Sequence, residues 1–492
     1  MTQTGYDAYY LNTYRHYRAS FFLFPLYIKG AAMSFLFDVI AGINSFVWGP
    51  WMMLLLIGTG VRLTFGTNFI QIRKFGTALR LMFRSAAKLD YIQNTPGDIS
   101  PFQALMTALA ATVGNGNIAG VATAIALGGP GAPVWMWLTG IVGMATKYAE
   151  AMLGAKYRQQ LPDGTMAGGP MYFLEHGMNR KWLAWLFALF GAISAFGIGN
   201  MVQANSVALV LKTELGIPLI VTGVILAILT YAVIIGGIQR IGSVAEFMVP
   251  IMCIIYVMSG LVVILVRIDH VPAAFALIFE SAFSGHAAAG GFAGAGVAQA
   301  LRYGVSRGIF SNEAGLGTAS IAHGAAKSSE PVRQGTIAML GVFIDTFVVN
   351  TITTLTIILT GAWMSGLTST AMTAKGFTTV LGPAGVWIVA FCSVIFGYST
   401  LLAWSYYGLR CTDFLFGIQA SLPYRLFWCV VIVFGALFSS DTVGIKFIWD
   451  IADTMNGAMA IPNLLGLLSL SAIVYGETAK YYSKSSDKQP GD

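Results

Sequence analysis

Charged residues are scarce in this sequence. Asp, Glu, Lys and Arg make up 10% of the 492 residues, against about 25% in soluble domains. Hydrophobic residues make up 56%, and the mean hydropathy is +0.71. A soluble chain of this length needs far more charge to cover its domains, so soluble folds are excluded. The apolar residues form runs of about 18 or more, long enough to cross a lipid bilayer. The chain is therefore expected to be a polytopic membrane protein.

Cysteine is also scarce, and no residue set typical of an active site is present. The four cysteines lie in or beside apolar runs without metal-ligand or CxxC spacing, so we expect packing roles for Cys253, Cys392, Cys411 and Cys429. A Ser-His-Asp set, a P-loop and a GxGxxG after a strand are all missing. The net charge of +7 does not gather into a face for nucleic acid. We therefore expect no enzymatic activity, no cofactor and no nucleic-acid partner.

Hydropathy predicts an all-α protein with about eleven transmembrane helices, at 46–66, 102–127, 131–153, 182–210, 216–236, 247–266, 292–323, 336–362, 384–408, 426–439 and 459–476. If the 67–100 loop is cytoplasmic, loops and termini on that side carry 17 Lys and Arg residues, against 7 on the other side. Because positive residues favour the cytoplasmic side, we expect the N-terminus outside and the C-terminus inside, in the cytoplasmic membrane.

The order of these spans predicts two repeats. Five spans fall in 101–267 and five in 291–476, and an odd number of crossings gives the two halves opposite orientations, as in inverted-repeat transporters. The remaining parts are an N-terminal extension (1–45), an extra helix (46–66), a basic loop (67–100) and a cytoplasmic tail (477–492). Residues 1–32 look detached, and the amphipathic pattern that begins at Met33 resembles a natural start.

The first span of each half is interrupted by Gly and polar residues. In the first half the interruption is Gly114-Asn115-Gly116-Asn117, and in the second it runs from Ser311 to Gly317. Paired interruptions of this kind indicate a binding site at the bilayer midplane. Close helix packing through small residues is the alternative, but it does not explain the Asn side chains. Ser100, Pro101 and Gln103 form a helix-start signal that places the first interruption about 16 Å further along the helix.

A broken helix exposes backbone N–H groups, which can bind an anion, and backbone carbonyls, which can bind a cation. The half-helix that begins near Asn117 presents free N–H groups suited to a carboxylate, and the one that ends near Ala111 presents carbonyls suited to Na⁺ or an ammonium group. A zwitterion satisfies both. Gln203 could donate to the carboxylate, and Ser399 and Thr400 offer oxygens for Na⁺. Alternatively, these two hydroxyls bond back to their own helix.

Several charged residues lie inside predicted spans, where they indicate function by default. Glu313 is interpreted as a cap or gate, with pairing to Arg307 or a role as proton carrier as alternatives. Asp345, with Asn350 and Thr351, could complete a cation site or fasten helices together. Further expectations are a satisfied pair between Lys147 and Glu150, an outer lining that includes Asp450 and Asp453, and no metal-binding role for His286 or His323.

The sequence resembles the alanine or glycine:cation symporter family (sodium:alanine symporters). The matching stretches include ISPFQALMTALAATVGNGNIAG (99–120), GGPMYFLEHG (168–177), IGNMVQANSVA (198–208), GVSRGIFSNEAGLGTASIAHGAA (304–326) and DTMNGAMAIPNLLGLLSLS (453–471). The resemblance covers about 33 to 480 and implies a LeuT-type 5+5 inverted repeat, with the 46–66 helix added. The sequence departs from the family at Asn115, where Thr or Ser is more common, and at Leu409, which replaces a cytoplasmic carboxylate.

The resemblance also implies roles for single residues. Substrate-binding residues would be Gly114, Gly116, Asn117 and Gln203 on the carboxylate side, and Phe310, Ser311 and Asn312 on the ammonium side. Na⁺ would bind to the carbonyls of Ala111 and Gly114 and the hydroxyls of Ser399 and Thr400. We expect a Na⁺-coupled symporter of a small neutral amino acid, alanine or glycine, that works by alternating access. H⁺ coupling through Glu313 and a channel are the alternatives. The oligomeric state is not encoded in these motifs.

Overall fold

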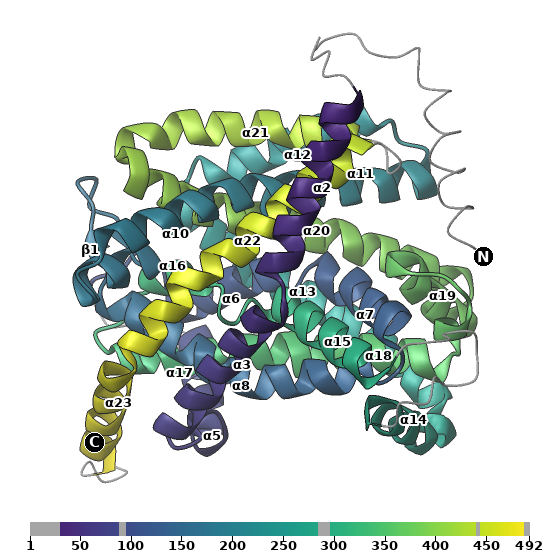
Figure 1. Cartoon of the computed structure of the whole chain (residues 1–492), viewed down its shortest axis with the longest axis horizontal. Helices are drawn as coiled ribbons and strands as arrows, with labels where there is room; N and C mark the ends of the chain where they lie inside the picture. Colours follow the sequence, from purple (N-terminus) through teal and green to yellow (C-terminus); the bar gives the residue numbers. More distant parts are fainter. Residues whose placement is uncertain (1–29, 88–94, 284–295, 439–442, 487–492) are drawn as a thin grey trace. The chain divides into compact units, whose positions relative to one another are not determined.

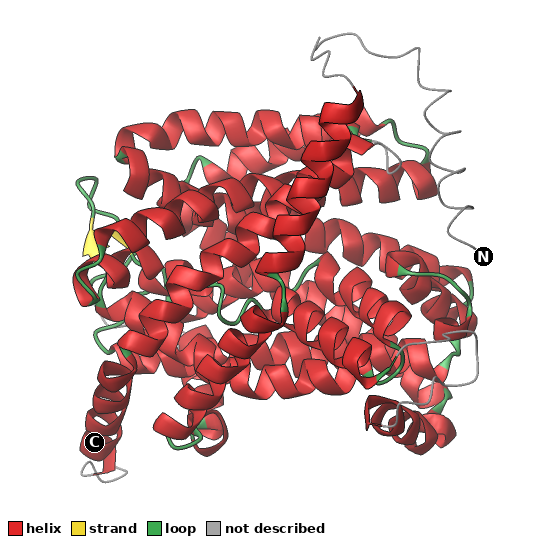
Figure 2. Cartoon of the chain, viewed as in Figure 1, coloured by secondary structure: helices red, strands yellow, loops and turns green. Residues whose placement is uncertain are grey.

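A computed structural model describes residues 30–87, 95–283, 296–438 and 443–486, and most of them are helical (Figure 2). Within this part of the chain, the strands are β1 (Gln159–Gln160) and β2 (Met166–Ala167), which pair antiparallel. The chain divides into two units, Met1–Gly42 and Ile43–Asp492. Of the first unit only the beginning of α2 (Gly30–Val47) is described. The predicted detached segment therefore lies almost wholly outside the described residues.

The segment expected as an extra helix and a basic loop is more ordered than predicted. The helices here are α3 (Pro50–Gly66), α4 (Ile70–Arg73) and α5 (Phe75–Ala86). In α5, Ala78 and Ser85 are buried while Arg80 and Arg84 are exposed, and the helix packs against α17. Hydropathy did not reveal α5, because it is short and one of its faces is charged.

The first repeat begins as the capping signal predicted. Ser100 and Gln103 form a reciprocal capping box at the start of α6, which ends at Thr112. The chain then bends by 48°. The elements of this region are α6 (Pro101–Thr112), η1 (Gly116–Gly120), α7 (Val121–Gly128), α8 (Ala132–Lys156), β1, β2, α9 (Pro170–Tyr172), η2 (Phe173–Gly177), α10 (Lys181–Ser194), η3 (Ala195–Met201), α11 (Val202–Leu215), α12 (Leu219–Ile234), α13 (Gly237–Val266), η4 (Ile268–His270) and α14 (Val271–Phe283).

The second repeat is also interrupted where predicted. Helix α15 ends at Asn312, and Glu313, Gly315 and Gly317 all have positive φ, a conformation that stops a helix. The elements are α15 (Val297–Asn312), α16 (Ala319–Gly324), α17 (Pro331–Val342), η5 (Phe343–Val349), α18 (Asn350–Leu359), η6 (Ala362–Met364), α19 (Ser369–Leu381), α20 (Pro383–Phe416), η7 (Ile418–Ala420), α21 (Ser421–Leu437), α22 (Val443–Ser469) and α23 (Ser471–Ser486).

Each predicted span overlaps a helix, but the last one differs in shape. The range 459–476 crosses a bend of 56° between α22 and α23. The Ser471 hydroxyl donates to the Leu468 carbonyl at this bend, where it competes with backbone bonding. Among the described residues, six helices are long and apolar enough to cross a membrane, or eight if each bent pair is one span. The count of eleven stays a prediction.

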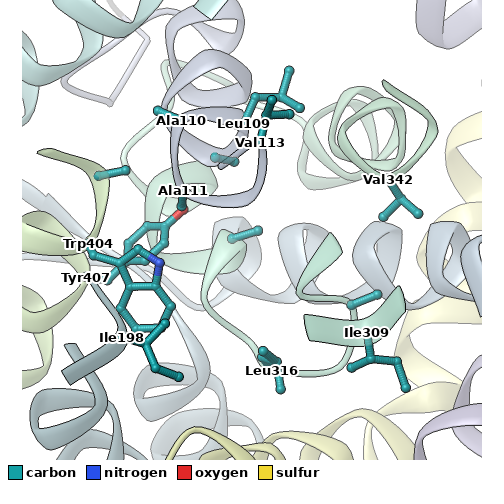
Figure 3. Close-up of a cluster of buried hydrophobic side chains, with 14 of the residues drawn as sticks. Leu109, Ala110, Ala111, Val113, Ile198, Ile309, Leu316, Val342, Trp404 and Tyr407 are labelled. Carbon is teal, nitrogen blue, oxygen red and sulfur yellow. The ribbon is translucent and has the colours of Figure 1, made fainter. Parts of the chain in front are cut away.

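The two interrupted helices pack against the long helices α8 and α20. Helix α8 packs against α15, α16 and α17, while α20 packs against α6, α10, α11 and α13; α12 lies along α21 (Figure 1). Buried apolar side chains from both breaks and from neighbouring helices belong to one cluster (Figure 3), which includes Leu109, Ala110, Ala111, Val113, Ile198, Ile309, Leu316, Val342, Trp404 and Tyr407. This core holds the two breaks in place.

Candidate functional site

Asn117 links the two breaks. It lies in the π-helical segment η1, and its side chain is fully buried. Its Oδ1 accepts from the Gly114 amide at 2.8 Å, and its Nδ2 lies 3.1 Å from Ser311 Oγ, 2.6 Å from Asp345 Oδ1 and 2.9 Å from Asn350 Oδ1. Because an amide NH₂ carries two hydrogens, these three acceptors share them. Asn117 therefore ties the first break to the end of α15 and to the middle of α17–α18.

Asn117, Ser311, Asp345 and Asn350 form a polar group that we call the Asn117 cluster. All four are at most 2% exposed. Ser311 Oγ lies 3.0 Å from both Asp345 oxygens, and Asn350 Nδ2 donates to Ser311 Oγ at 3.2 Å. Carboxylate, hydroxyl and amide oxygens are ligands for hard cations. The structure thus brings together predicted substrate and coupling residues. Thr351, in contrast, lies apart and accepts from Trp137 Nε1 at 2.9 Å.

Two of the residues predicted to bind Na⁺, Thr400 and Gly114, meet at the end of α6, whereas the carbonyl that Thr400 contacts belongs to Ala110 and not to the predicted Ala111. Thr400 Oγ1 lies 3.2 Å from the Ala110 carbonyl, and a Cβ built on Gly114 would lie 2.9 Å from the same hydroxyl. Ser399 and Thr400 also donate to the Phe396 carbonyl on their own helix, each at 2.9 Å. The alternative of back-bonding is therefore observed for both hydroxyls. It leaves their oxygen lone pairs available as acceptors.

Of the other predicted substrate residues, Gln203 lies beside the first break, and Gly116 lies close to Phe310 and Ser311. Near the first break, Asn115 Nδ2 donates to Gln203 Oε1 at 3.3 Å, and Gln203 Nε2 donates to the Ile198 carbonyl at 3.1 Å. A Cβ built on Gly116 would lie 3.8 Å from Ser311 Cα and 4.0 Å from Phe310 Cδ1, so the breaks approach each other closely here. A Cβ at Gly116 would be in ordinary van der Waals contact with both residues.

Asn312 and Glu313 bond both within the second break and to neighbouring helices. The Asn312 amide donates to Thr346 Oγ1 at 3.1 Å, and its Oδ1 accepts from the Ala314 amide at 3.0 Å. The Glu313 carboxylate accepts from the hydroxyl of Thr318 and from the indole of Trp404. It forms no ion pair with Arg307, so that alternative is wrong. Glu313 instead fastens the break to α20.

Glu150, rather than Glu313, holds the free amides of the second break. Its Oε1 accepts from the Gly315 amide at 2.9 Å, the Gly317 amide at 3.0 Å and Asn463 Nδ2 at 2.8 Å. The predicted satisfied pair with Lys147 is wrong: Lys147 is 3% exposed, and its Nζ has no hydrogen-bond partner in the described part of the chain. The backbone amides take the carboxylate because the break leaves them without carbonyl partners.

Arg158 joins the beginning of α6 to the end of α16. Its guanidinium donates to the carbonyl of Pro96 at 2.9 Å, of Ser328 at 2.8 Å and of Ala326. The two chain segments also pair directly, since the Lys327 amide donates to the Ile99 carbonyl at 2.7 Å. We call this junction the Arg158 latch. The latch connects the chain before α6 to the chain after α16.

Asp98 lies beside this latch, in the loop before α6. Its Oδ2 accepts from the Met166 amide at 2.9 Å. Burial raises the pKa of Asp98 above its ordinary value of 3.8, while the Met166 hydrogen bond and the charge of Arg410 partly offset that effect. Burial of this loop therefore favours the protonated form of Asp98.

Three contributors to this architecture were missed at the level of sequence: Asn463, Trp404 and Arg158. Asn463 donates to both Glu150 and the Gly315 carbonyl. Its position inside a predicted apolar span was a usable signal, because such polar residues seldom lack a partner. Trp404 and Arg158 carry no comparable signal, since their acceptors depend on the tertiary packing.

Two interrupted membrane helices that meet at one buried polar cluster are the arrangement of the LeuT-type fold. The fold agrees with the crystal structure of MhsT in complex with L-phenylalanine, which has a TM-score of 0.54 and 12% sequence identity and covers 78% of this chain and 98% of that chain. Residues 33–491 match the sodium:alanine symporter family, and the chain belongs to that family. It is therefore a multi-pass membrane transport protein.

Two relatives illustrate the range of the family. The chain is 50% identical to the sodium/alanine symporter AgcS of Methanococcus maripaludis over 89% of this chain and 96% of that protein. It is 36% identical to the probable sodium/glutamine symporter GlnT of Bacillus subtilis over 93% of this chain and 94% of that protein. Both names include sodium, whereas the amino acid differs between them.

Proposed function

We propose that this protein imports alanine or glycine together with Na⁺ across the cytoplasmic membrane by alternating access. The observation that carries the proposal is the contact between the breaks at Asn117, which bonds to Ser311 across the two repeats. Membership of the sodium:alanine symporter family and the 50% identity to AgcS support Na⁺ and alanine as the transported pair. The basic residues support an outside N-terminus and a cytoplasmic C-terminus.

The substrate would lie between the two breaks, near Gly116 and Phe310. Backbone amides around Gly114 and Gly116, with Asn117 and Gln203, would hold its carboxylate, and the end of α15 would hold its ammonium group. Gly116 lies close to Ser311 and Phe310 across this junction. The 50% identity to AgcS, whose name includes alanine, against 36% to GlnT, is the reason to propose alanine or glycine rather than glutamine.

Na⁺ would bind where Thr400 meets the end of α6, with Ser399 and the carbonyls of Ala111 and Gly114 as further ligands. The negative end of the α6 dipole favours a cation there. Asp345 would contribute a negative charge to the Asn117 cluster and couple ion binding to the junction of the two breaks. Cation binding and substrate binding would then both stabilise the same closed arrangement, which is the thermodynamic requirement for coupling.

The test is uptake of labelled L-alanine into proteoliposomes at fixed pH, with and without an inward Na⁺ gradient. We expect concentrative uptake only with the Na⁺ gradient, saturation with alanine, and counterflow exchange. Uptake that ignores Na⁺ and follows a pH gradient would instead favour H⁺ coupling through Glu313. Flux without saturation or counterflow would favour a channel. Competition by glycine, serine and glutamine would then rank the substrates.

A further inference from the structure

The segment that follows α3 is basic and has no acidic residue. Residues 67–88 include three Arg and two Lys, and neither Asp nor Glu. The chain turns sharply after α3, with positive φ at Asn68 and Phe69, and then forms α4 and α5. The amide of Phe102, in the first turn of α6, donates to Ser85 Oγ near the end of α5 at 3.0 Å. Helix α5 therefore lies beside the ends of two candidate membrane spans.

One face of α4 and α5 exposes arginines together with large apolar side chains. Arg73, Arg80 and Arg84 are exposed, and beside them Ile72 is 65% and Phe83 64% exposed. We call these five residues the Arg73–Arg80 face. The opposite side of α5 packs against α17. Basic residues next to exposed large apolar residues are typical of a helix that lies in the interface between lipid and water.

Within the described ranges, Arg73 and Arg80 have no acidic partner. The ion pairs found there involve other residues. Arg73 Nη1 donates to the Asn68 carbonyl at 3.4 Å, which uses one of the five N–H groups of its guanidinium. Lys74 differs, because its Nζ lies 4.1 Å from the centre of the Tyr482 ring in α23. A guanidinium with free N–H groups is well matched to a phosphate, so this face offers binding groups for one.

An anionic phospholipid matches both parts of the Arg73–Arg80 face. Its phosphate accepts from the arginines, and its acyl chains cover Ile72 and Phe83. A free phosphate would neutralise the charge but would leave these two apolar side chains exposed. Basic residues beside the end of a membrane span are attracted to the anionic lipids of the cytoplasmic leaflet, and this segment is cytoplasmic in the proposed orientation.

Two contacts connect α5 to the elements of the candidate site. Ser85 accepts from the Phe102 amide, which belongs to the first turn of the first interrupted helix. At the other end of α5, the ring centres of Phe75 and Phe343 are 4.7 Å apart. Phe343 begins η5, the segment that carries Asp345 of the Asn117 cluster. The position of α5 is therefore linked to both α6 and η5.

We propose that the Arg73–Arg80 face binds anionic phospholipids of the cytoplasmic leaflet. Arg73 and Arg80 hold the phosphates, while Ile72 and Phe83 lie among the acyl chains. The bound lipid holds α5 against α6 and η5. The inference uses the proposed orientation of the chain, but it does not depend on which ion or amino acid is transported.

The first test is a titration of the purified full-length protein with phosphatidylglycerol, and separately with phosphatidylcholine, followed by native mass spectrometry. Each basic residue near an anionic surface strengthens binding about fivefold. The parent should therefore bind phosphatidylglycerol at least about tenfold more tightly than phosphatidylcholine. Arg73→Gln/Arg80→Gln should lose this preference, whereas Arg73→Lys/Arg80→Lys keeps the charge and should keep it.

The matched control is Arg180→Gln/Arg240→Gln. It removes two exposed arginines from other elements on the same predicted side. Arg240 donates to the Ala232 carbonyl, much as Arg73 donates to the Asn68 carbonyl. This control should keep the full preference for phosphatidylglycerol.

The second test is the hydrogen exchange of α5 in nanodiscs. Discs of phosphatidylcholine alone are compared with discs in which one lipid in four is phosphatidylglycerol. Phosphatidylglycerol should slow the exchange of the amides of residues 75–86 several-fold in the parent and in the control, but not in Arg73→Gln/Arg80→Gln.

Several results would overturn the inference. Equal affinity of the parent for the two lipids, or an unchanged preference in Arg73→Gln/Arg80→Gln, excludes this binding surface. An equal loss in Arg180→Gln/Arg240→Gln shows that total charge matters rather than this face. If inorganic phosphate at equal concentration displaces phosphatidylglycerol, the arginines bind a free anion and not a lipid. Neither test uses Na⁺ or alanine, so absence of Na⁺-driven uptake would contradict the proposed function alone.

Discussion

The side-chain amide of Asn117 lies 3.1 Å from the hydroxyl of Ser311, although 194 positions separate the two residues in the sequence. Asn117 belongs to the first break and Ser311 to the end of the helix before the second. Through this contact, a change in one broken helix is transmitted directly to the other. A transporter that alternates between two states requires such a shared junction, because ligand binding shifts a conformational equilibrium only through contacts that differ between states.

Replacement of Asn117 by Ala should weaken alanine binding tenfold to a hundredfold. The substitution leaves the Gly114 amide without its acceptor and removes one donor from Ser311 and from Asp345, which keep their bond to each other. Loss of about 1–3 kcal/mol, at about 1.4 kcal/mol per tenfold, gives this range. The measurement is alanine binding to purified protein. Asn205→Ala is the control, since Asn205 is equally buried but donates to the carbonyls of Gly435 and Phe438. Wild-type affinity in Asn117→Ala would refute the site.

Replacement of Thr400 by Val should weaken Na⁺ binding. Valine keeps the shape of threonine but removes the oxygen that faces the end of α6. Loss of one polar contact of about 1.4 kcal/mol should raise the Na⁺ concentration for half-maximal uptake about tenfold. Ser405→Ala is the control, because Ser405 donates to the Leu402 carbonyl of its own helix and has no other side-chain partner among the described residues. An equal effect of both variants would show that helix back-bonding, and not Na⁺, explains the result.

Replacement of Glu150 by Ala should destabilise the second break. The Gly315 and Gly317 amides and Asn463 would lose their shared acceptor, at about 1–3 kcal/mol for each unsatisfied group. We expect a lower midpoint of thermal unfolding in detergent. Glu150→Gln keeps an acceptor oxygen and should recover most of the stability. If Gln destabilises as much as Ala, the charge of Glu150 matters more than its hydrogen bonds.

The Arg158 latch should control opening at one end of the interrupted helices. Arg158→Gln cannot span three carbonyls, so residues 95–99 and 324–328 should exchange their amide hydrogens at least several-fold faster. Arg180→Gln changes an exposed arginine on the same predicted side and should leave these segments unchanged. Unchanged exchange in Arg158→Gln would show that the direct pairing of Ile99 with Lys327 suffices to hold the ends.

Asp98 should make stability depend on pH. Because burial raises its folded pKa above 3.8, the native state binds more protons than the unfolded state just above that pH. The contribution of Asp98 is therefore most favourable below 3.8 and declines as the pH rises through the raised pKa. Asp98→Asn keeps an acceptor for Met166 and should remove this decline. The measurement is the thermal unfolding midpoint across this pH range. An identical pH profile in both proteins would contradict the prediction.

The sequence predicted the interruptions better than it predicted the contacts made there. Gly and Asn inside apolar runs indicated both breaks, and the Ser100–Gln103 capping box was confirmed, because these signals act over a few neighbouring residues. The Lys147–Glu150 pair was wrong although its spacing was favourable. Helix geometry places these side chains on one face, but it does not show that free amides lie closer to the carboxylate.

By itself, the sequence determined that this is a polytopic membrane protein, where its helices break, and which family it resembles. Low charge and long apolar runs fix the first property, since hydrocarbon excludes exposed charge. Only the tertiary structure decided which polar groups meet: Asn117 with Ser311 and Asp345, Glu150 with Gly315 and Asn463, and Arg158 with Ala326. Glu150 and Gly315 are 165 positions apart, and the packing of separate helices, rather than local pattern, brings such partners within hydrogen-bonding distance.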